Sequence, residues 1–307
     1  MARSTKSPKT CRLPEVVGYR EETMTMRKTL LAATALALTA GATLAEDLIN
    51  DELVVNGETP MVTQAPAPDH LEYMSVIRSG WTFRSPETQD MQRDDFDNPG
   101  MLAVEAAMSD WETPMGAEGQ SCADCHGDPE SLAGVRATYP KWDEERETVQ
   151  TVELQVIECM SERMGMEEPW GYDSGNMRDM SALISYVSRG LPVSVAIDGP
   201  AAEAWQTGKD LYYTRYGQLE LACANCHEDN YDNMIRADHL SQGQINGFPA
   251  YRLKQGGIVS VHNRFRGCIR DTRAETFPVG SPEFVALELY VASRGNGLSV
   301  EGPSVRN

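Results

Sequence analysis

The chain has 307 residues, enough for two domains of ordinary size, and 41% of them are hydrophobic. Its formal net charge at pH 7 is -19. An acidic surface of this strength excludes nucleic acids and anionic membrane faces as partners, and it favours basic protein partners.

The N-terminal region contains a pattern typical of export. Residues 26–45 read "MRKTLLAATALALTAGATLA", which places two basic residues, an apolar run and small residues in the order of a secretory signal peptide. Cleavage is expected after Ala45, and the apolar run is too short for a membrane span. The polar residues before it indicate a translation start at Met24 or Met26. We therefore assign 1–45 to a leader and signal peptide and predict a periplasmic protein.

A five-residue motif occurs twice, as "CADCH" at 122–126 and "CANCH" at 223–227. Cys-x-x-Cys-His is compatible with a zinc site, a redox dithiol or covalent c-type haem. Zinc-binding cysteine pairs usually lie ~15 to 20 residues apart, and a thioredoxin-like dithiol needs more strand signal than we find here. Haem attachment uses every element of the motif. We therefore predict two c-type haems, held by Cys122, Cys125, Cys223 and Cys226, with His126 and His227 as proximal ligands.

The regions after the two motifs also repeat. "YPKW" begins at Tyr139 and Cys159 follows twenty residues later, while "FPAY" begins at Phe248 and Cys268 follows at the same distance. "SYVSRGLPVSV" in the first half resembles "LYVASRGNGLSV" in the second. The chain is therefore interpreted as a tandem duplication.

Glycine and proline mark a boundary between the copies at Gly190–Pro200. This predicts a mainly α fold with two tandem cytochrome c-like domains, 46–190 and 191–307. Residues 46 to about 100 are expected to form an extended segment that wraps or leads into the first domain. Helices are expected across Val149, Val152, Val156, Met160 and Met164, in "AAEAWQTGKDLYYTRY", and from Pro282 after Ser281.

Each haem iron needs a second axial ligand. Cys159 and Cys268 occupy equivalent positions in the two copies, which favours thiolate ligation of both irons. A mutual disulfide, buried inert thiols and methionine ligation remain alternatives. We interpret His239 and His262 as exposed or structural imidazoles, because a cysteine occupies the repeated position. A thiolate ligand would lower the reduction potential of the iron.

The segments that precede the two cysteines differ in charge. Window 143–164 is mostly acidic, whereas window 252–273 is basic. Such charges often form only a solvated face, but here the basic ones surround a cysteine in an acidic protein. We interpret Cys268 as a candidate nucleophile or sulfur carrier for an anion, and Cys159 as an electron-transfer or structural ligand. The basic residues are Arg252, Lys254, Arg264, Arg266, Arg270 and Arg273.

The two motifs, Cys159 and above all "HNRFRGCIRD" make the sequence similar to the SoxA family, the dihaem c-type cytochromes of the periplasmic thiosulfate-oxidising Sox system. The resemblance covers nearly the whole mature chain. It implies that Cys159 and Cys268 are the distal iron ligands. It also implies that Cys268 is the catalytic residue and carries a persulfide, and that Arg264 binds substrate.

The resemblance further implies an L-cysteine S-thiosulfotransferase. In that activity thiosulfate is joined oxidatively to a cysteine of the carrier protein SoxYZ. Two electrons leave through haem to the monohaem partner SoxX and then to another cytochrome c. The alternative is a dihaem electron-transfer protein without bond-making chemistry, which would not need a thiol at Cys268.

Overall fold

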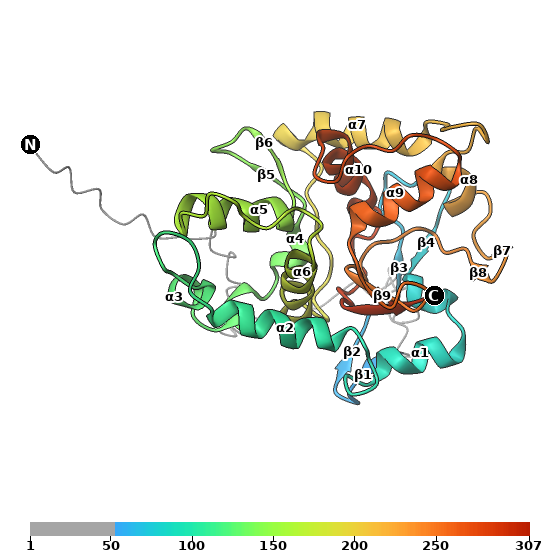
Figure 1. The fold of residues 1–307 in the computed structure, drawn as a ribbon. Helices are drawn as coiled ribbons and strands as arrows, with labels where there is room; N and C mark the ends of the chain where they lie inside the picture. The colour runs from blue at the N-terminus through green and yellow to red at the C-terminus, as the bar shows by residue number, and fades with distance from the viewer. Residues whose placement is uncertain (1–52) are drawn as a thin grey trace, which may run out of the picture.

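The computed structural model describes residues 53–307, so the predicted leader and signal peptide lie outside the described residues. The described chain is mainly α, as predicted, and its longest helices form two pairs that pack across each other in Figure 1. Helix α2 (Met101–Glu112) packs on α6 (Gly175–Val187) in the first half, and α7 (Ala202–Tyr213) packs on α10 (Pro282–Ser293) in the second. Within residues 53–307 no helix is both long and apolar enough to cross a bilayer.

The other helices that the structure describes lie outside these two pairs. They are η2 (Gly80–Phe83), α1 (Pro86–Arg93), α3 (Cys122–His126), η3 (Pro129–Leu132), α4 (Val135–Thr138), α5 (Val152–Glu158), η4 (Cys159–Arg163), η5 (Gly199–Ala201), α8 (Cys223–His227) and α9 (Val261–Asp271).

The strands that the structure describes have two or three residues each. They are β1 (Val54–Val55), β2 (Thr59–Pro60), β3 (Gln64–Pro66), β4 (Val76–Arg78), β5 (Lys141–Asp143), β6 (Thr148–Gln150), β7 (Met234–Ile235), β8 (Asp238–His239), β9 (Ala250–Arg252), β10 (Gly257–Val259) and β11 (Ser304–Arg306). Four sheets are antiparallel pairs of consecutive strands. The fifth has the order β10-β9-β11, with β11 parallel to β9.

The pair α7 and α10 forms the centre of the second half. A Cβ on Gly208 of α7 would lie 1.9 Å from the carbonyl oxygen of Ala286 in α10, so only glycine permits this close approach of the two backbones. Helix α10 begins as predicted, with Pro282 in its first turn and the Ser281 side chain accepting a hydrogen bond from Phe284 N at 3.4 Å. Phe284 is fully buried against the neighbouring aromatic side chains of this core.

The two halves share an apolar core. Ala137 and Val149 of the first half lie in one buried cluster with Val285 and Leu289 of α10. Burial of apolar surface contributes roughly 25 cal/mol per Å², so this shared cluster stabilises the association of the halves.

The helix expected from Val149 onward is wrong at both of its ends. Val149 lies in β6 and pairs with Trp142 of β5. Helix α5 begins only at Val152, after Thr151, whose hydroxyl accepts a hydrogen bond from Leu154 N at 3.2 Å. Beyond Glu158 the chain continues as the π-helical turn η4. Apolar spacing alone did not distinguish the hairpin and the π turn from one continuous helix.

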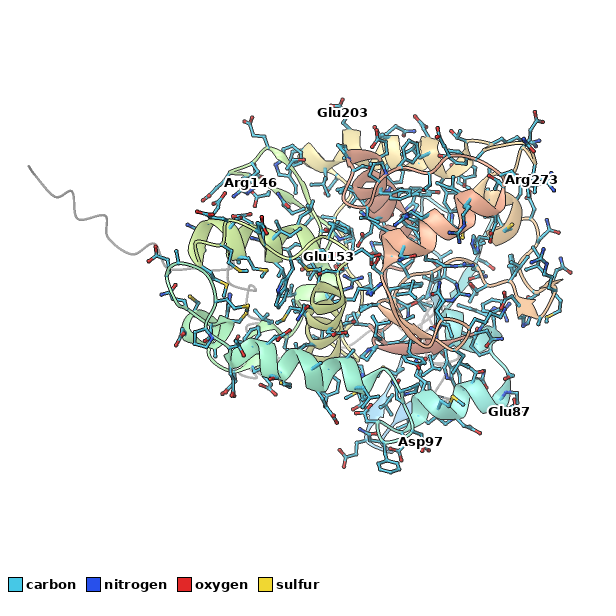
Figure 2. All side chains as sticks on the ribbon, in the orientation of Figure 1. Glu87, Asp97, Arg146, Glu153, Glu203 and Arg273 are labelled. Carbon is cyan, nitrogen blue, oxygen red and sulfur yellow. The ribbon has the colours of Figure 1, made fainter. Side chains whose placement is uncertain are left out.

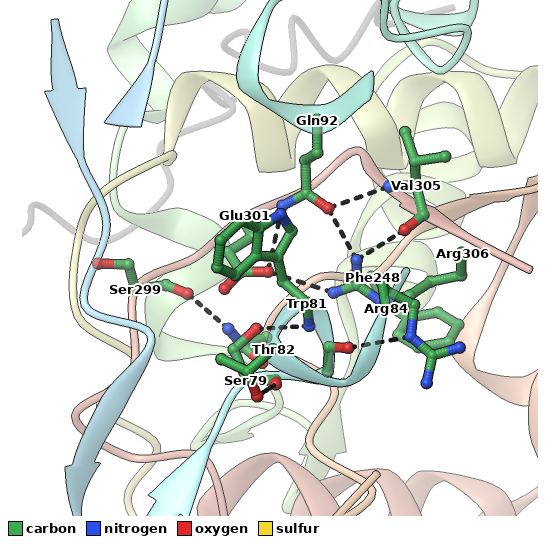
Figure 3. Close-up of polar contacts among 12 residues, drawn as sticks. Ser79, Trp81, Thr82, Arg84, Gln92, Phe248, Ser299, Glu301, Val305 and Arg306 are labelled. Carbon is green, nitrogen blue, oxygen red and sulfur yellow. Dashed lines mark hydrogen bonds and ion pairs between the residues drawn. The ribbon is translucent and has the colours of Figure 1, made fainter. Parts of the chain in front are cut away.

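Residues 53–100 do not wrap the first half, as the sequence suggested, but pack mainly on the second. Ile77 is buried in one cluster with Leu298. The Gln92 side chain accepts a hydrogen bond from Val305 N at 3.1 Å, within the polar cluster of Figure 3. The strands of this segment pair with one another, β1 with β2 and β3 with β4, and its side chains contact the C-terminal end of the chain.

Candidate functional site

The two Cys-x-x-Cys-His motifs form the equivalent short helices α3 and α8. Ser121 begins α3 with a capping box, in which its hydroxyl accepts from Asp124 N at 3.1 Å and the Asp124 carboxylate accepts from Ser121 N at 2.8 Å. Before α8, Asn225 Oδ1 accepts from Ala222 N at 2.9 Å. Helical spacing places the first cysteine, the second cysteine and the histidine of each motif along one side of the helix.

An apolar cavity lies beside α3 in the first half. It brings Cys122 and His126 of the motif together with Cys159, which was predicted from the repeat. The other residues in its wall are Trp111, Leu132, Val135, Tyr139, Val152, Gln155, Val156, Met160, Met164, Met180 and Ile184. A flat apolar macrocycle is the kind of group that such a wall accommodates, so the residues of this site fit a c-type haem.

The histidine of α8 is prepared for ligation through one ring nitrogen. His227 Nδ1 lies 2.8 Å from the carbonyl oxygen of Ser241, and burial lowers the pKa of His227 to about 4. The imidazole is therefore neutral, with Nδ1–H donating to the carbonyl and the Nε2 lone pair available for a metal. Gly243 makes this arrangement possible, because a Cβ there would lie 2.8 Å from His227 Cγ. These features fit an iron ligand.

Cys268 lies close to the cysteines of α8, in the second half. Burial raises the pKa of Cys223 to about 12, and Cys268 adds to this effect. The pKa of Cys226 is raised by the same two causes. Cys268 therefore lies close enough to Cys223 and Cys226 to raise the pKa of both. Cys159 lies in the cavity of the other half.

The two predicted distal cysteines occupy equivalent places after equivalent hairpins. The Thr151 hydroxyl caps α5 and the Ser260 hydroxyl caps α9, and the cysteine follows eight residues later in each case. At Cys159 the helix has changed to the π turn η4, whereas α9 continues as an α-helix through Cys268. π turns interrupt helices frequently at functional sites.

Arg264 is one turn before Cys268 on α9. The Cys268 sulfur raises the pKa of Arg264, against the lowering effect of burial. Apart from its chain neighbours and the backbone of its own helix, a Cβ on Gly267 would have only Arg264 Nη1, at 3.8 Å, within 4 Å among the described residues. The backbone beside Cys268 is therefore open, and a guanidinium group lies over it.

The first site has a different electrostatic environment. Arg146 donates to Glu158 and to Glu162, each at 2.7 Å, so its charge is compensated at the outer edge of α5 and η4 (Figure 2). Burial raises the pKa of Tyr139, and the negative groups Cys159 and Asp143 add to the effect. An anion would be repelled from this site.

A buried polar network joins the two halves and was not found by sequence reasoning. His262 is fully buried on α9 and stacks on Tyr172 with a ring-centroid distance of 4.6 Å. Gly280 N donates to His262 Nδ1 at 2.9 Å, so the proton is on Nε2, which lies 3.0 Å from a Glu288 carboxylate oxygen. Tyr172 Oη is 2.9 Å from Thr151 Oγ1.

His239 and His262, which follow the second motif in the sequence, have structural contacts. His262 is the buried group just described and is not exposed to a substrate cleft. His239 is partly buried, and its Nε2 lies 3.1 Å from the carbonyl oxygen of Asp232. These contacts agree with the interpretation of His239 and His262 as structural imidazoles.

A comparison with protein families gives the class of this chain. A family model described as "SoxA/TsdA, cytochrome c domain" matches residues 106–193 and again 207–300. The chain is therefore a c-type cytochrome with two tandem cytochrome c domains, as predicted, and c-type haem is its covalently bound cofactor.

Similar proteins identify the family more closely. A relative from Rhodovulum sulfidophilum, named "L-cysteine S-thiosulfotransferase subunit SoxA", is 61% identical over 260 residues, which cover 84% of this chain and 90% of that protein. A relative of the same name from Paracoccus pantotrophus is 56% identical and covers 92% of this chain and 99% of its own length. The chain belongs to the SoxA family.

A solved structure is also similar throughout. "Crystal structure of SoxXA from P. pantotrophus" contains a chain that is 57% identical and superposes with a TM-score of 0.82. The match covers 85% of the present chain and 100% of that chain. The predicted family and fold are both confirmed.

Proposed function

We propose that this protein is an L-cysteine S-thiosulfotransferase, the activity named for its relatives, and that it conjugates thiosulfate to a cysteine of the carrier SoxYZ. The observation that carries the proposal is the position of Cys268. It lies beside the cysteines of α8 and one helical turn from Arg264, in a cationic part of an acidic protein. A plain electron carrier needs neither the thiol nor the guanidinium there.

The geometry of the two sites supports an assignment of the iron and haem ligands. His126 shares a cavity with Cys159, and His227 has its Nε2 available on the helix next to Cys268. We therefore propose one proximal histidine and one distal cysteine for each iron. The thioether bonds to haem are assigned to Cys122, Cys125, Cys223 and Cys226.

The proposed reaction forms one sulfur–sulfur bond. The carrier thiol and thiosulfate give a carrier S–S–SO₃⁻ group, one proton and two electrons. Haem, when bound, accepts electrons one at a time and passes them on. Arg264 holds the sulfonate oxygens through its planar fork, and Cys268 provides the sulfur, as thiol or persulfide, at which the sulfane end is received.

The partners and location complete the proposal. We assign SoxX as the monohaem partner, because the similar solved structure is of SoxXA, and a further cytochrome c as the final electron acceptor. The periplasm is the compartment in which the predicted signal peptide, 26–45, would place the protein.

The test is thiosulfate-dependent reduction of cytochrome c by the purified protein with SoxX and SoxYZ. We expect Cys268→Met to abolish turnover while both haems remain low-spin, because methionine can ligate iron but cannot accept a sulfane sulfur. Undiminished turnover in this variant would favour the alternative, a dihaem electron-transfer protein whose catalytic partner lies elsewhere.

A further inference from the structure

Two adjacent residues of the first half, Tyr172 and Asp173, contact the helices that lead to both repeated cysteines. They form a turn directly before Ser174, whose hydroxyl accepts a hydrogen bond from Met177 N at 3.3 Å and begins α6. Figure 1 shows α5 in the first half of the chain and α9 in the second. The turn contacts the N-terminal residue of each of these two helices.

The Asp173 carboxylate binds the first turn of α9 through two hydrogen bonds. Its Oδ1 accepts from the Ser260 hydroxyl and its Oδ2 accepts from Asn263 Nδ2, each at 2.7 Å. Ser260 Oγ in turn accepts from Asn263 N at 3.2 Å. Only 11% of the Asp173 side chain is exposed, and Arg178 Nη1 lies 3.9 Å from its Oδ1. Because the two oxygens bind residues that are three positions apart, the carboxylate fixes the rotation of this turn.

The Tyr172 side chain contacts both halves from the same turn. Its Oη lies 2.9 Å from Oγ1 of Thr151, the residue before α5, and 3.3 Å from His262 Nε2 in α9. The ring stacks on His262 at a centroid distance of 4.6 Å, and a Cβ on Gly280 would lie 2.9 Å from Tyr172 Cδ2. The position of Asp173 is therefore fixed by its enclosed neighbour as well as by α6.

The duplication shows why α9 needs a carboxylate from outside. Thr151 and Ser260 are equivalent, because each begins its helix eight residues before the repeated cysteine. Two residues further on, α5 has an acidic residue of its own, Glu153, whereas α9 has His262 and no acidic residue in its first turn. Negative charge at a helix N-terminus is stabilising, and Asp173 supplies it to α9 from the other half of the chain.

The first turn of α9 determines the direction of the proposed site residues. Arg264 N donates to Ser260 O at 3.1 Å, and Cys268 follows Arg264 by a further four residues. Residues four apart lie on one side of a helix, so Ser260, Arg264 and Cys268 are neighbours along α9. A rotation at Ser260 would therefore displace both the guanidinium group and the sulfur atom.

We propose that Asp173 is a positioning residue for Arg264 and Cys268. It holds the first turn of α9 so that the guanidinium group and the sulfur keep the geometry that conjugation requires. This inference rests on the proposed function, because it takes Cys268 as the residue that receives the sulfane sulfur. It gives the first half of the chain a role in bond formation in addition to electron transfer.

The test combines steady-state cytochrome c reduction, with thiosulfate, SoxX and SoxYZ, and electron paramagnetic resonance of the haem-loaded protein. Asp173→Ala removes both hydrogen bonds and should lower kcat/KM by about 10- to 100-fold, as small misplacements of reacting groups do. The iron signal that Cys268→Met alters should also shift in Asp173→Ala, whereas the signal that Cys159→Met alters should not. A contact that only stabilises the fold would not change one iron signal selectively.

A second variant, Asp173→Asn, keeps the shape of the side chain in case Asp173→Ala does not fold. Its amide retains one carbonyl acceptor, so kcat/KM should fall by only about 3- to 10-fold. Asn263→Ala removes the partner of Asp173 Oδ2. Combined with Asp173→Ala, it should leave kcat/KM within about 2-fold of Asp173→Ala alone, because both substitutions remove the same contact.

The matched control is Ser174→Ala. Ser174 is the next residue in the chain, and its replacement removes the N-cap of α6 while the Asp173 carboxylate is unchanged. The urea midpoint of unfolding should fall, as it does when a capping hydroxyl is lost. We expect kcat/KM to stay within about 2-fold of wild type and both iron signals to stay unchanged.

Two results would overturn the inference. One is wild-type kcat/KM together with wild-type iron signals in Asp173→Ala. The other is an equal loss in Asp173→Ala and Ser174→Ala, which would assign the loss to reduced stability. Neither result decides the proposed function, which depends on the turnover of Cys268→Met. If that variant keeps full turnover, the iron signals of Asp173→Ala still report whether Asp173 positions Cys268.

Discussion

The two halves of this protein build the same local scaffold and give it different chemistry. Each half has a hairpin, a hydroxyl-capped helix and a cysteine eight residues after the cap. Cys159 lines an apolar cavity near acidic groups, and Arg146 is paired there with Glu158 and Glu162. Cys268 lies one helical turn after Arg264, beside open backbone. Under the proposed function, the charge around a duplicated cysteine, rather than its position in the fold, separates electron transfer from bond formation.

The largest expected effect on thiosulfate turnover comes from replacing each of the two cysteines, in turn, with methionine. Cys268→Met should reduce thiosulfate turnover by roughly 10³-fold or more, as loss of a nucleophile does, whereas Cys159→Met should keep it within about 10-fold. Steady-state cytochrome c reduction measures both. Similar losses in the two variants, with low-spin haem spectra retained, would show that the halves do not differ in the way described here.

The next largest effect concerns the charge one turn before each cysteine. Arg264→Gln gives the second site the residue of the first and should raise the KM for thiosulfate by about 10- to 100-fold, because charged hydrogen bonds contribute about 1.5–3 kcal/mol. The reciprocal change, Gln155→Arg, should leave the KM unchanged. An equal KM in Arg264→Gln and wild type would remove this residue from the substrate site.

Much of this comparison could be predicted from the sequence. The motif spacing and the repeated cysteine positions indicated two haem domains, because covalent attachment requires residues that are adjacent in the chain. The opposite charges of windows 143–164 and 252–273 were also visible, because many charged residues lie within each short window. The packing of residues 53–100 on the second half could not be found in this way, since contacts such as that of Arg84 with His239 O join positions far apart in the sequence.

Tertiary packing also decided the remaining differences. Val149 has apolar spacing that suits a helix, but a hairpin with Trp142 buries it equally well. Tyr172, His262 and Glu288 come from three distant segments, and no periodic pattern connects them. Long-range polar networks of this kind have no local sequence signal.

A smaller effect is expected at the glycine that contacts the second proximal histidine. Gly243 has a φ of 81°, and an added Cβ would lie 2.8 Å from His227 Cγ. Gly119 in the first half has a φ of 61° and no neighbour within 4 Å of such an atom among the described residues. Gly243→Ala should therefore lower the free energy of unfolding by about 2–4 kcal/mol, from strain and overpacking, and shift the potential of one haem.

The control for that variant is Gly119→Ala, which has the backbone strain without the contact. Gly119→Ala should lower the free energy of unfolding by about 1–2 kcal/mol and leave both haem potentials as in wild type. Urea unfolding and redox titration measure the two quantities. Equal destabilisation by the two substitutions, with equal potentials, would mean that the loop containing Gly243 does not position His227.

The smallest predicted effect tests whether the halves behave as one unit. Tyr172→Phe removes a hydroxyl that contacts Thr151 in its own half and His262 Nε2, at 3.3 Å, in the other. Because the buried hydroxyl of Thr151 then has fewer hydrogen-bond partners, the free energy of unfolding should fall by about 1–2 kcal/mol. Tyr186→Phe is the control, and it should change the free energy by less than about 0.5 kcal/mol.

The shape of the unfolding curve matters as much as its midpoint. The halves share the apolar cluster of Val149 and Leu289, so loss of one hydroxyl should lower the stability of a single transition without dividing it in two. If Tyr172→Phe instead separates the transition into two steps, the polar network rather than the apolar core holds the halves together. The electron-transfer and substrate sites would then depend on His262 and its partners for their relative placement.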